Sequence, residues 1–140
     1  MQRRIFLVRI AIAVLVLGAI AGVSIVQDRR ANQARANSAR EAACSAVSAA
    51  AGGDVRALAD SYGRALTSSE VASLTALIPL AARSDLGGFD APFWNPLGDS
   101  RCVVQVQHDG DQSFAVDVTL ESLDGQGGWV VVDLRRAVAK

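Results

Sequence analysis

The residues best suited to chemistry are few and lie near the ends of predicted strands. His108 is the only histidine, and Asp109 and Asp111 follow it closely. A histidine beside carboxylates could bind a metal ion or transfer protons. However, the Asp109-Gly110 pair is typical of a hairpin turn, where acidic residues and a polar strand end are ordinary. We interpret this group as part of a turn and assign it no catalytic or metal-binding role.

Two further carboxylates, Asp117 and Asp133, lie within predicted strands. Alternation places Asp117 on the face opposite Val116 and Val118, which indicates a solvent-facing position unless the sheet curls around a cavity. The chain contains no GxSxG, phosphate-binding loop or GxGxxG pattern. We therefore predict no catalytic residue and no cofactor.

Cys44 and Cys102 are the only cysteines. In an oxidising compartment an even count favours a disulfide, which would stabilise the fold by roughly 4 kcal/mol in the chain-entropy model. We predict this bond, with two buried free thiols as the alternative. The chain has no CxxC motif or His/Cys grouping, so a zinc site is not expected.

An apolar run over residues 6–26 begins at Phe6, ends at Val26 and is interrupted only by Arg9 and Ser24. As a helix it would be about 31 Å long, which matches a hydrocarbon core of about 30 Å. We predict an uncleaved anchor in the lipid bilayer, with the N-terminus inside and the C-terminal domain outside the cytoplasmic membrane. Cleavage after Ala21, giving a secreted protein, is the alternative.

The formal net charge is zero, but the charges are segregated along the chain. The first 40 residues are rich in arginine, whereas residues 41–134 are acidic, a balance that excludes a nucleic-acid footprint. We divide the chain into a membrane anchor (1–27), a juxtamembrane helix (28–53) and one small extracytoplasmic domain (54–140).

The segment after the anchor predicts helices. Alanines recur at helical spacing from Ala36 to Ala50, a narrow stripe that allows close packing against the domain or, as the alternative, a second copy in a homo-oligomer. Asp54 can cap a helix that runs through Gly63 to Leu66. Residues 67–70, Thr-Ser-Ser-Glu, form a capping box for another short helix.

The remaining residues predict a loop and three strands. Residues 84–100 contain Phe89, Phe93 and Trp94 among prolines and glycines, and we interpret them as a structured loop that covers the core or, alternatively, contacts a partner or a membrane surface. Alternating apolar residues then predict three antiparallel strands, starting near Cys102, Phe114 and Trp129. The sequence therefore predicts an α+β fold, with two short helices packed on a three-stranded meander.

The closing strand at residues 128–134, Gly-Trp-Val-Val-Val-Asp-Leu, and the segment at 39–43, Ala-Arg-Glu-Ala-Ala, carry a resemblance. With the order of elements, they make the chain resemble actinobacterial single-span membrane proteins with a nuclear-transport-factor-like (cystatin-like) domain, such as those associated with mammalian-cell-entry transporters. The resemblance implies a curved sheet backed by helices and an accessory role in an envelope assembly.

These observations lead to one functional hypothesis and one rival. We expect a non-enzymatic, membrane-anchored accessory or scaffold domain of a cell-envelope complex, with an unidentified envelope protein as its partner. The rival is a small-ligand binding or enzymatic domain with a pocket between helices and sheet and His108 or Asp117 at its mouth.

Overall fold

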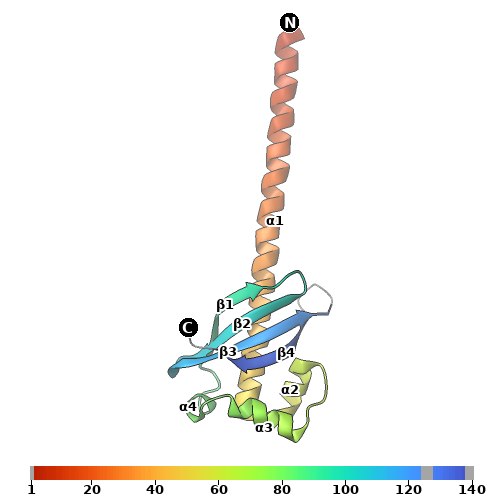
Figure 1. Ribbon diagram of the computed structural model, residues 1–140. Coiled ribbons are helices and arrows are strands. Elements are labelled where there is room, and N and C mark those ends of the chain that lie inside the picture. Colours follow the sequence, from red (N-terminus) through yellow and green to blue (C-terminus); the bar gives the residue numbers. More distant parts are fainter. Residues whose placement is uncertain (1, 124–127, 138–140) are drawn as a thin grey trace. The chain divides into compact units, whose positions relative to one another are not determined.

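The structure is a computed structural model that describes residues 2–123 and 128–137. Within these ranges, the side chains of residues 2–18, 20, 21, 23, 24 and 111–113 are not described. The elements follow the order α1 (Gln2–Gly52), α2 (Val55–Tyr62), α3 (Ser68–Ala76), α4 (Leu80–Arg83), β1 (Phe89–Pro96), β2 (Arg101–His108), β3 (Asp111–Ser122) and β4 (Trp129–Arg136) (Figure 1). The predicted α+β class is confirmed.

The chain divides into two units, Met1–Ala34 and Arg35–Lys140. The described residues of the first unit are helical throughout. No helix among the described residues is long and apolar enough to cross a membrane. The predicted span over residues 6–26 falls mostly on positions whose side chains lie outside the described ones, and it stays a prediction.

In the second unit, the C-terminal part of α1 contributes its alanine stripe to the core. Ala39, Ala43, Ala46, Val47 and Ala50 are completely buried. Their small side chains allow the helix backbone to approach the sheet closely. The prediction that the stripe packs within the chain is confirmed.

The sheet has four antiparallel strands in the order β1-β2-β3-β4, not the predicted three. The additional strand is β1, which lies in the segment predicted to be a loop. Its prolines Pro92 and Pro96 argue against a central strand, but an edge strand tolerates them because one side of its backbone has no neighbour. A register shift between Asp90 and Phe93 contains Pro92.

The helices after Gly52 follow their sequence signals with two corrections. Asp54 caps α2 as predicted, since its carboxylate accepts from Ala57 N–H, but Gly63 ends this helix with a left-handed φ of 64° and does not lie inside it. The predicted capping box starts α3, where the Glu70 N–H donates to Thr67 Oγ1 at 3.2 Å. The short helix α4 was not predicted.

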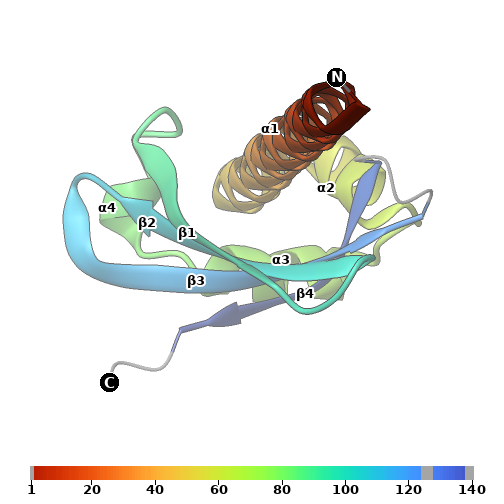
Figure 2. The same cartoon turned by 90° about the horizontal axis from the view of Figure 1, so that it is seen from above.

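The core lies between helix α1 and one face of the sheet, which we call the inner face. Figure 2 shows that the sheet is curved. Valines at alternate positions of β2 and β3 face inward and pair across the strands, so that Val104 lies opposite Val118 and Val106 opposite Val116. All four are completely buried.

Candidate binding pocket beside strand β4

His108 lies at the end of β2 with only 3% of its surface exposed. Gly110 N–H donates to its Nδ1 at 2.9 Å, so Nε2 carries the proton and donates to the Asp85 carbonyl at 2.9 Å. The Phe89 ring meets the imidazole edge-on at a centroid distance of 4.8 Å. Both ring nitrogens are therefore engaged in fixing the turn, and His108 does not line the pocket described below.

Two of the acidic residues considered in the sequence, Asp109 and Asp117, lie away from the His108 ring. Asp109 is exposed, Asp117 lies opposite Gln105 on the outer face of the sheet, and the side chain of Asp111 lies outside the described residues. Among the described residues, no group of three or more His, Cys, Asp or Glu could hold a metal ion.

Both cysteines are free, so the predicted disulfide is absent from the structure. Cys102 lies opposite Pro96, whereas Cys44 shares a hollow with Phe89, whose strand partner is His108. Along β2, Cys102 and His108 are about 20 Å apart. A disulfide requires Cα atoms within about 7 Å. The two thiols lie near opposite ends of the sheet, which sequence spacing could not reveal.

The inner face at the β1–β2 loop contains both tryptophans, and we call it the tryptophan end. The indole N–H groups of Trp94 and Trp129 are buried. That of Trp129 has no hydrogen-bond acceptor among the described residues, and that of Trp94 lies beside the Cys102 thiol. The Arg35 guanidinium donates to the Gly98 carbonyl at 3.2 Å and to the Asp99 carbonyl, and it lies 5.3 Å from the centre of the Trp129 ring. Arg35 thereby joins α1 to the β1–β2 loop and to Trp129 of β4.

The three aromatic residues of the segment predicted to be a loop differ in burial. Phe89 and Trp94 pack against the core, as one of the two interpretations expected, whereas the Phe93 side chain is 60% exposed. Only Phe93 therefore remains on the surface as a residue for a partner or a membrane.

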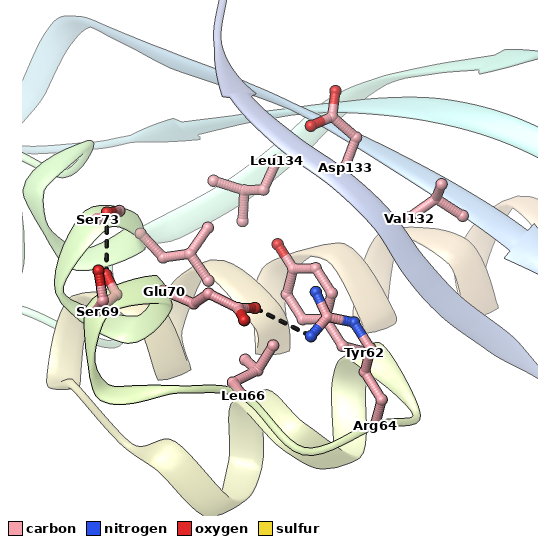
Figure 3. Close-up of a pocket in the computed structure, with 10 residues that line it drawn as sticks. Tyr62, Arg64, Leu66, Ser69, Glu70, Ser73, Val132, Asp133 and Leu134 are labelled. Carbon is pink, nitrogen blue, oxygen red and sulfur yellow. Dashed lines mark hydrogen bonds and ion pairs between the residues drawn. The ribbon is translucent and has the colours of Figure 1, made fainter.

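A pocket of about 330 Å³ lies between the α2–α3 segment and strand β4 (Figure 3). We call it the Tyr62 pocket. Leu66 and Leu74 provide apolar surface from the helical side, and Leu134 provides it from the strand. Its complete lining is Tyr62, Arg64, Leu66, Ser69, Glu70, Ser73, Leu74, Val132, Asp133 and Leu134.

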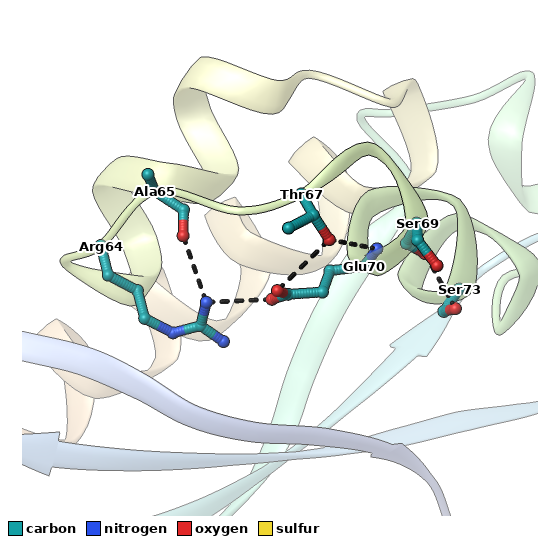
Figure 4. Close-up of polar contacts among 6 residues, drawn as sticks. All are labelled: Arg64, Ala65, Thr67, Ser69, Glu70 and Ser73. Atoms are coloured by element: carbon teal, nitrogen blue, oxygen red, sulfur yellow. Dashed lines mark hydrogen bonds and ion pairs between the residues drawn. The ribbon is translucent and has the colours of Figure 1, made fainter.

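The polar rim of the Tyr62 pocket is organised by the capping box of α3 (Figure 4). Arg64 Nη1 lies 2.9 Å from Glu70 Oε2 and also donates to the Ala65 carbonyl at 3.2 Å. The hydrogen bond from Arg64 is the main cause that lowers the pKa of Glu70, with a further contribution from Thr67. The Arg64–Glu70 pair is therefore ionised at neutral pH and largely neutralises itself.

Tyr62 comes from the last turn of α2, and Figure 3 shows its hydroxyl directed towards β4. No hydrogen bond to this hydroxyl is found among the described residues. Burial raises the pKa of Tyr62, and the Asp133 carboxylate raises it further, while Arg64 acts in the opposite direction. The phenol therefore keeps its proton and can donate one hydrogen bond to a ligand.

This arrangement suits binding better than catalysis. Ser73 Oγ donates to the Ser69 carbonyl at 2.9 Å, so that hydroxyl is engaged within its own helix. A phenol with a raised pKa stays protonated at neutral pH and so does not act as a base. No described side chain of the pocket couples a base to a nucleophile. The pocket offers apolar contact, one phenol donor and an ion pair at its rim.

The sequence predicted local roles for residues of this pocket, but not that these residues lie close together. The helical spacing of Tyr62 from Leu58 predicts that it faces the core, and the capping box predicts that Glu70 caps a helix. Both predictions are confirmed locally. The pocket forms because β4, more than 60 residues later, lies beside them. Neither His108 nor Asp117, the residues expected at a pocket mouth, takes part.

A second hollow of about 550 Å³ lies where the end of α1 meets Leu86 and Phe89. Cys44 is on its wall, and burial, followed by the Asp90 carboxylate, raises the pKa of this thiol. A protonated thiol is a weak nucleophile, so this hollow has no reactive cysteine at neutral pH.

Comparison of the chain with protein-family models, with curated proteins and with solved structures found no match.

Proposed function

We propose that this chain is a non-enzymatic, membrane-anchored accessory domain of a cell-envelope complex, with its C-terminal unit outside the membrane. The observation that carries the proposal is the apolar run over residues 6–26, which has the length of a membrane span and is flanked by arginines. The accessory role is the one implied by the resemblance stated above. His108 supports this role, because both of its ring nitrogens are engaged in structural hydrogen bonds.

Topology is tested with the full chain in cells. Asn95 is exposed, so Asn95→Cys provides a thiol at the surface. The half-buried Cys44 is replaced by alanine in the same chain, and the native Cys102 is fully buried and gives little background. We expect an impermeant maleimide to label Asn95→Cys in intact cells and the protein to stay with the membrane in alkaline extraction. Labelling only after lysis contradicts the proposed orientation. An intact mass lacking residues 1–21 supports the secreted alternative.

The partner is tested by photo-crosslinking from Phe93, the exposed aromatic residue of β1. We expect a crosslinker at this position to capture one envelope protein, and a crosslinker at exposed Asp109, in the turn between β2 and β3, to capture less of it. If the purified chain captures no envelope protein and turns over a small molecule, the accessory role fails.

A second candidate function, binding of a small ligand, is favoured by the Tyr62 pocket. A volume of about 330 Å³ with a free phenol donor fits a small, partly apolar molecule that carries a hydrogen-bond acceptor. In a ligand screen by thermal shift, we expect a hit whose effect is lost in Tyr62→Phe and kept in Ser61→Ala. Equal shifts in both variants place the ligand elsewhere.

A further inference from the structure

The two edges of the sheet differ in their capacity to pair with another strand. The β1 edge contains Pro92 and Pro96, which discourage strand pairing. Each edge strand has one register shift; in β4 it lies at Val132, and the pairing is regular from Asp133 onward. The β4 edge has no proline and is rich in valine, which favours extended structure. Among the described residues, no backbone hydrogen bond joins β4 to any element other than β3.

Only part of the β4 edge is accessible. The end of α2 covers the first part, since a Cβ atom at Gly63 would lie 3.3 Å from Val130 Cγ1. The part at residues 132–136 is more open, with 47% of Val132 and 73% of the Arg135 side chain exposed. An incoming strand would therefore pair with residues 132–136.

The charge pattern of this segment is self-complementary. Asp133 and Arg135 point to the same face of the sheet and form an ion pair within the strand. If a second, antiparallel copy of β4 is placed with its two-fold axis at Leu134, Asp133 lies opposite the partner's Arg135, and Arg135 lies opposite the partner's Asp133. Each charge would then have an opposite charge across the interface as well as along its own strand.

We propose that a second copy of this chain pairs with residues 132–136 of β4 and joins two sheets into one of eight strands. A two-fold axis is the commonest symmetry of homo-oligomers, and it requires the same patch on both copies. The contact is short, so it gains from a membrane anchor, which raises the local concentration of the copies. This pairing goes beyond the proposed accessory role.

The test uses the full chain with two different affinity tags, co-expressed in one membrane. Purification through one tag measures how much of the other copy is retained. We expect retention for the native chain and a loss of roughly tenfold for Asp133→Arg in both copies, because two like-charged pairs then face each other. Arg135→Asp in both copies has the same expected effect.

The combination of the two variants separates pairing between chains from stability within the chain. When one copy has Asp133→Arg and the other Arg135→Asp, both intrachain ion pairs are lost, but every charge across the interface is again opposite. We expect retention to return to near the native level. Arg101→Glu in both copies, which breaks the exposed Arg101–Glu121 pair on β2 and β3, is the matched control and leaves retention unchanged.

Three results overturn the pairing. The native copies fail to retain each other, the single charge reversals retain each other as well as the native chain does, or the mixed pair is no better than either reversal alone. None of these results affects the anchor, because the topology experiment measures that separately.

Discussion

The two ends of the inner face are built in different ways. At the His108 end, both ring nitrogens are hydrogen-bonded, and Gly88 and Gly110 fit closely around the ring. At the tryptophan end, the buried indole N–H of Trp129 has no acceptor among the described residues, and Arg35 of α1 donates to carbonyls of an exposed loop. A buried donor without an acceptor costs roughly 1–3 kcal/mol. The His108 end therefore specifies one arrangement, whereas the tryptophan end tolerates changes.

Replacement of His108 tests this contrast most strongly. His108→Ala removes a buried ring, leaves the Gly110 N–H without its acceptor and leaves the Asp85 carbonyl with only the Gly88 N–H, so we expect a loss of about 2–4 kcal/mol in the free energy of unfolding. Urea unfolding of the full chain in detergent, followed by tryptophan fluorescence, measures it. Asp109→Ala, at an exposed neighbour, is the control and changes stability by less than about 0.5 kcal/mol. If His108→Ala lowered the free energy of unfolding as little as Asp109→Ala does, the proposed difference between the two ends would be wrong.

The fit around the imidazole can be tested without touching it. A Cβ atom at Gly88 would lie 2.7 Å from His108 Nε2, so Gly88→Ala forces the ring to move and should cost about 1–3 kcal/mol. At Gly87 the nearest atom would be 3.7 Å away, an ordinary contact. Gly87→Ala is therefore the matched control, and equal unfolding midpoints for the two variants would contradict a tightly fitted His108.

At the tryptophan end, Arg35→Ala removes two hydrogen bonds to loop carbonyls and the contact with the Trp129 ring. These groups are partly exposed, so we expect a smaller loss of about 1–2 kcal/mol and a shift in tryptophan emission. Arg35→Lys keeps the charge but not the planar fork and should recover part of the loss. Full recovery by lysine would show that charge alone holds the helix to the loop.

The Cys102 thiol provides a pH test at the same end. Burial raises its pKa, and the nearby Trp94 N–H and Arg35 only partly oppose this. The folded state thus holds the proton more firmly than the unfolded state, and this contribution is complete below the unfolded thiol pKa of about 8.5 and is lost as pH rises through the folded pKa. We expect the native chain to lose more stability than Cys102→Ala between pH 8 and 10. Parallel profiles would contradict the raised pKa.

The smallest effect is expected for Trp129→Phe. The indole N–H has no acceptor among the described residues, so its removal deletes an unsatisfied group and offsets part of the lost ring contact. We expect a change below about 1 kcal/mol, against a larger loss for Trp129→Ala, which also removes the ring beneath Arg35. A cost for phenylalanine equal to that for alanine would show that the N–H has a partner.

Local signals in the sequence predicted local structure well. Asp54, the capping box at Thr67 and Glu70, and the alternation of β2 and β3 each act through neighbours in the chain, and each prediction was confirmed. The strand β1 was missed because its prolines are acceptable only at an edge, which depends on the order of strands. The disulfide was predicted from the even cysteine count and the expected oxidising compartment, but the two thiols lie near opposite ends of the sheet.

The Tyr62 pocket shows the same limit. From the sequence, Tyr62 could be predicted only as a core residue. Nothing near it in the chain indicates that Asp133 and Leu134 lie beside it. Likewise, the spacing of Asp133 and Arg135 does not predict pairing between copies unless β4 is known to be an edge strand.

The prolines of β1 also limit how many copies can join. Because Pro92 and Pro96 leave that side of the sheet unsuitable for a neighbour, each molecule offers one edge for growth. A molecule with one such edge forms a closed pair and cannot extend into a fibre. Conversion of both prolines to valine would give every copy two growing edges, and the expected result is insoluble aggregate whose yield rises with expression level.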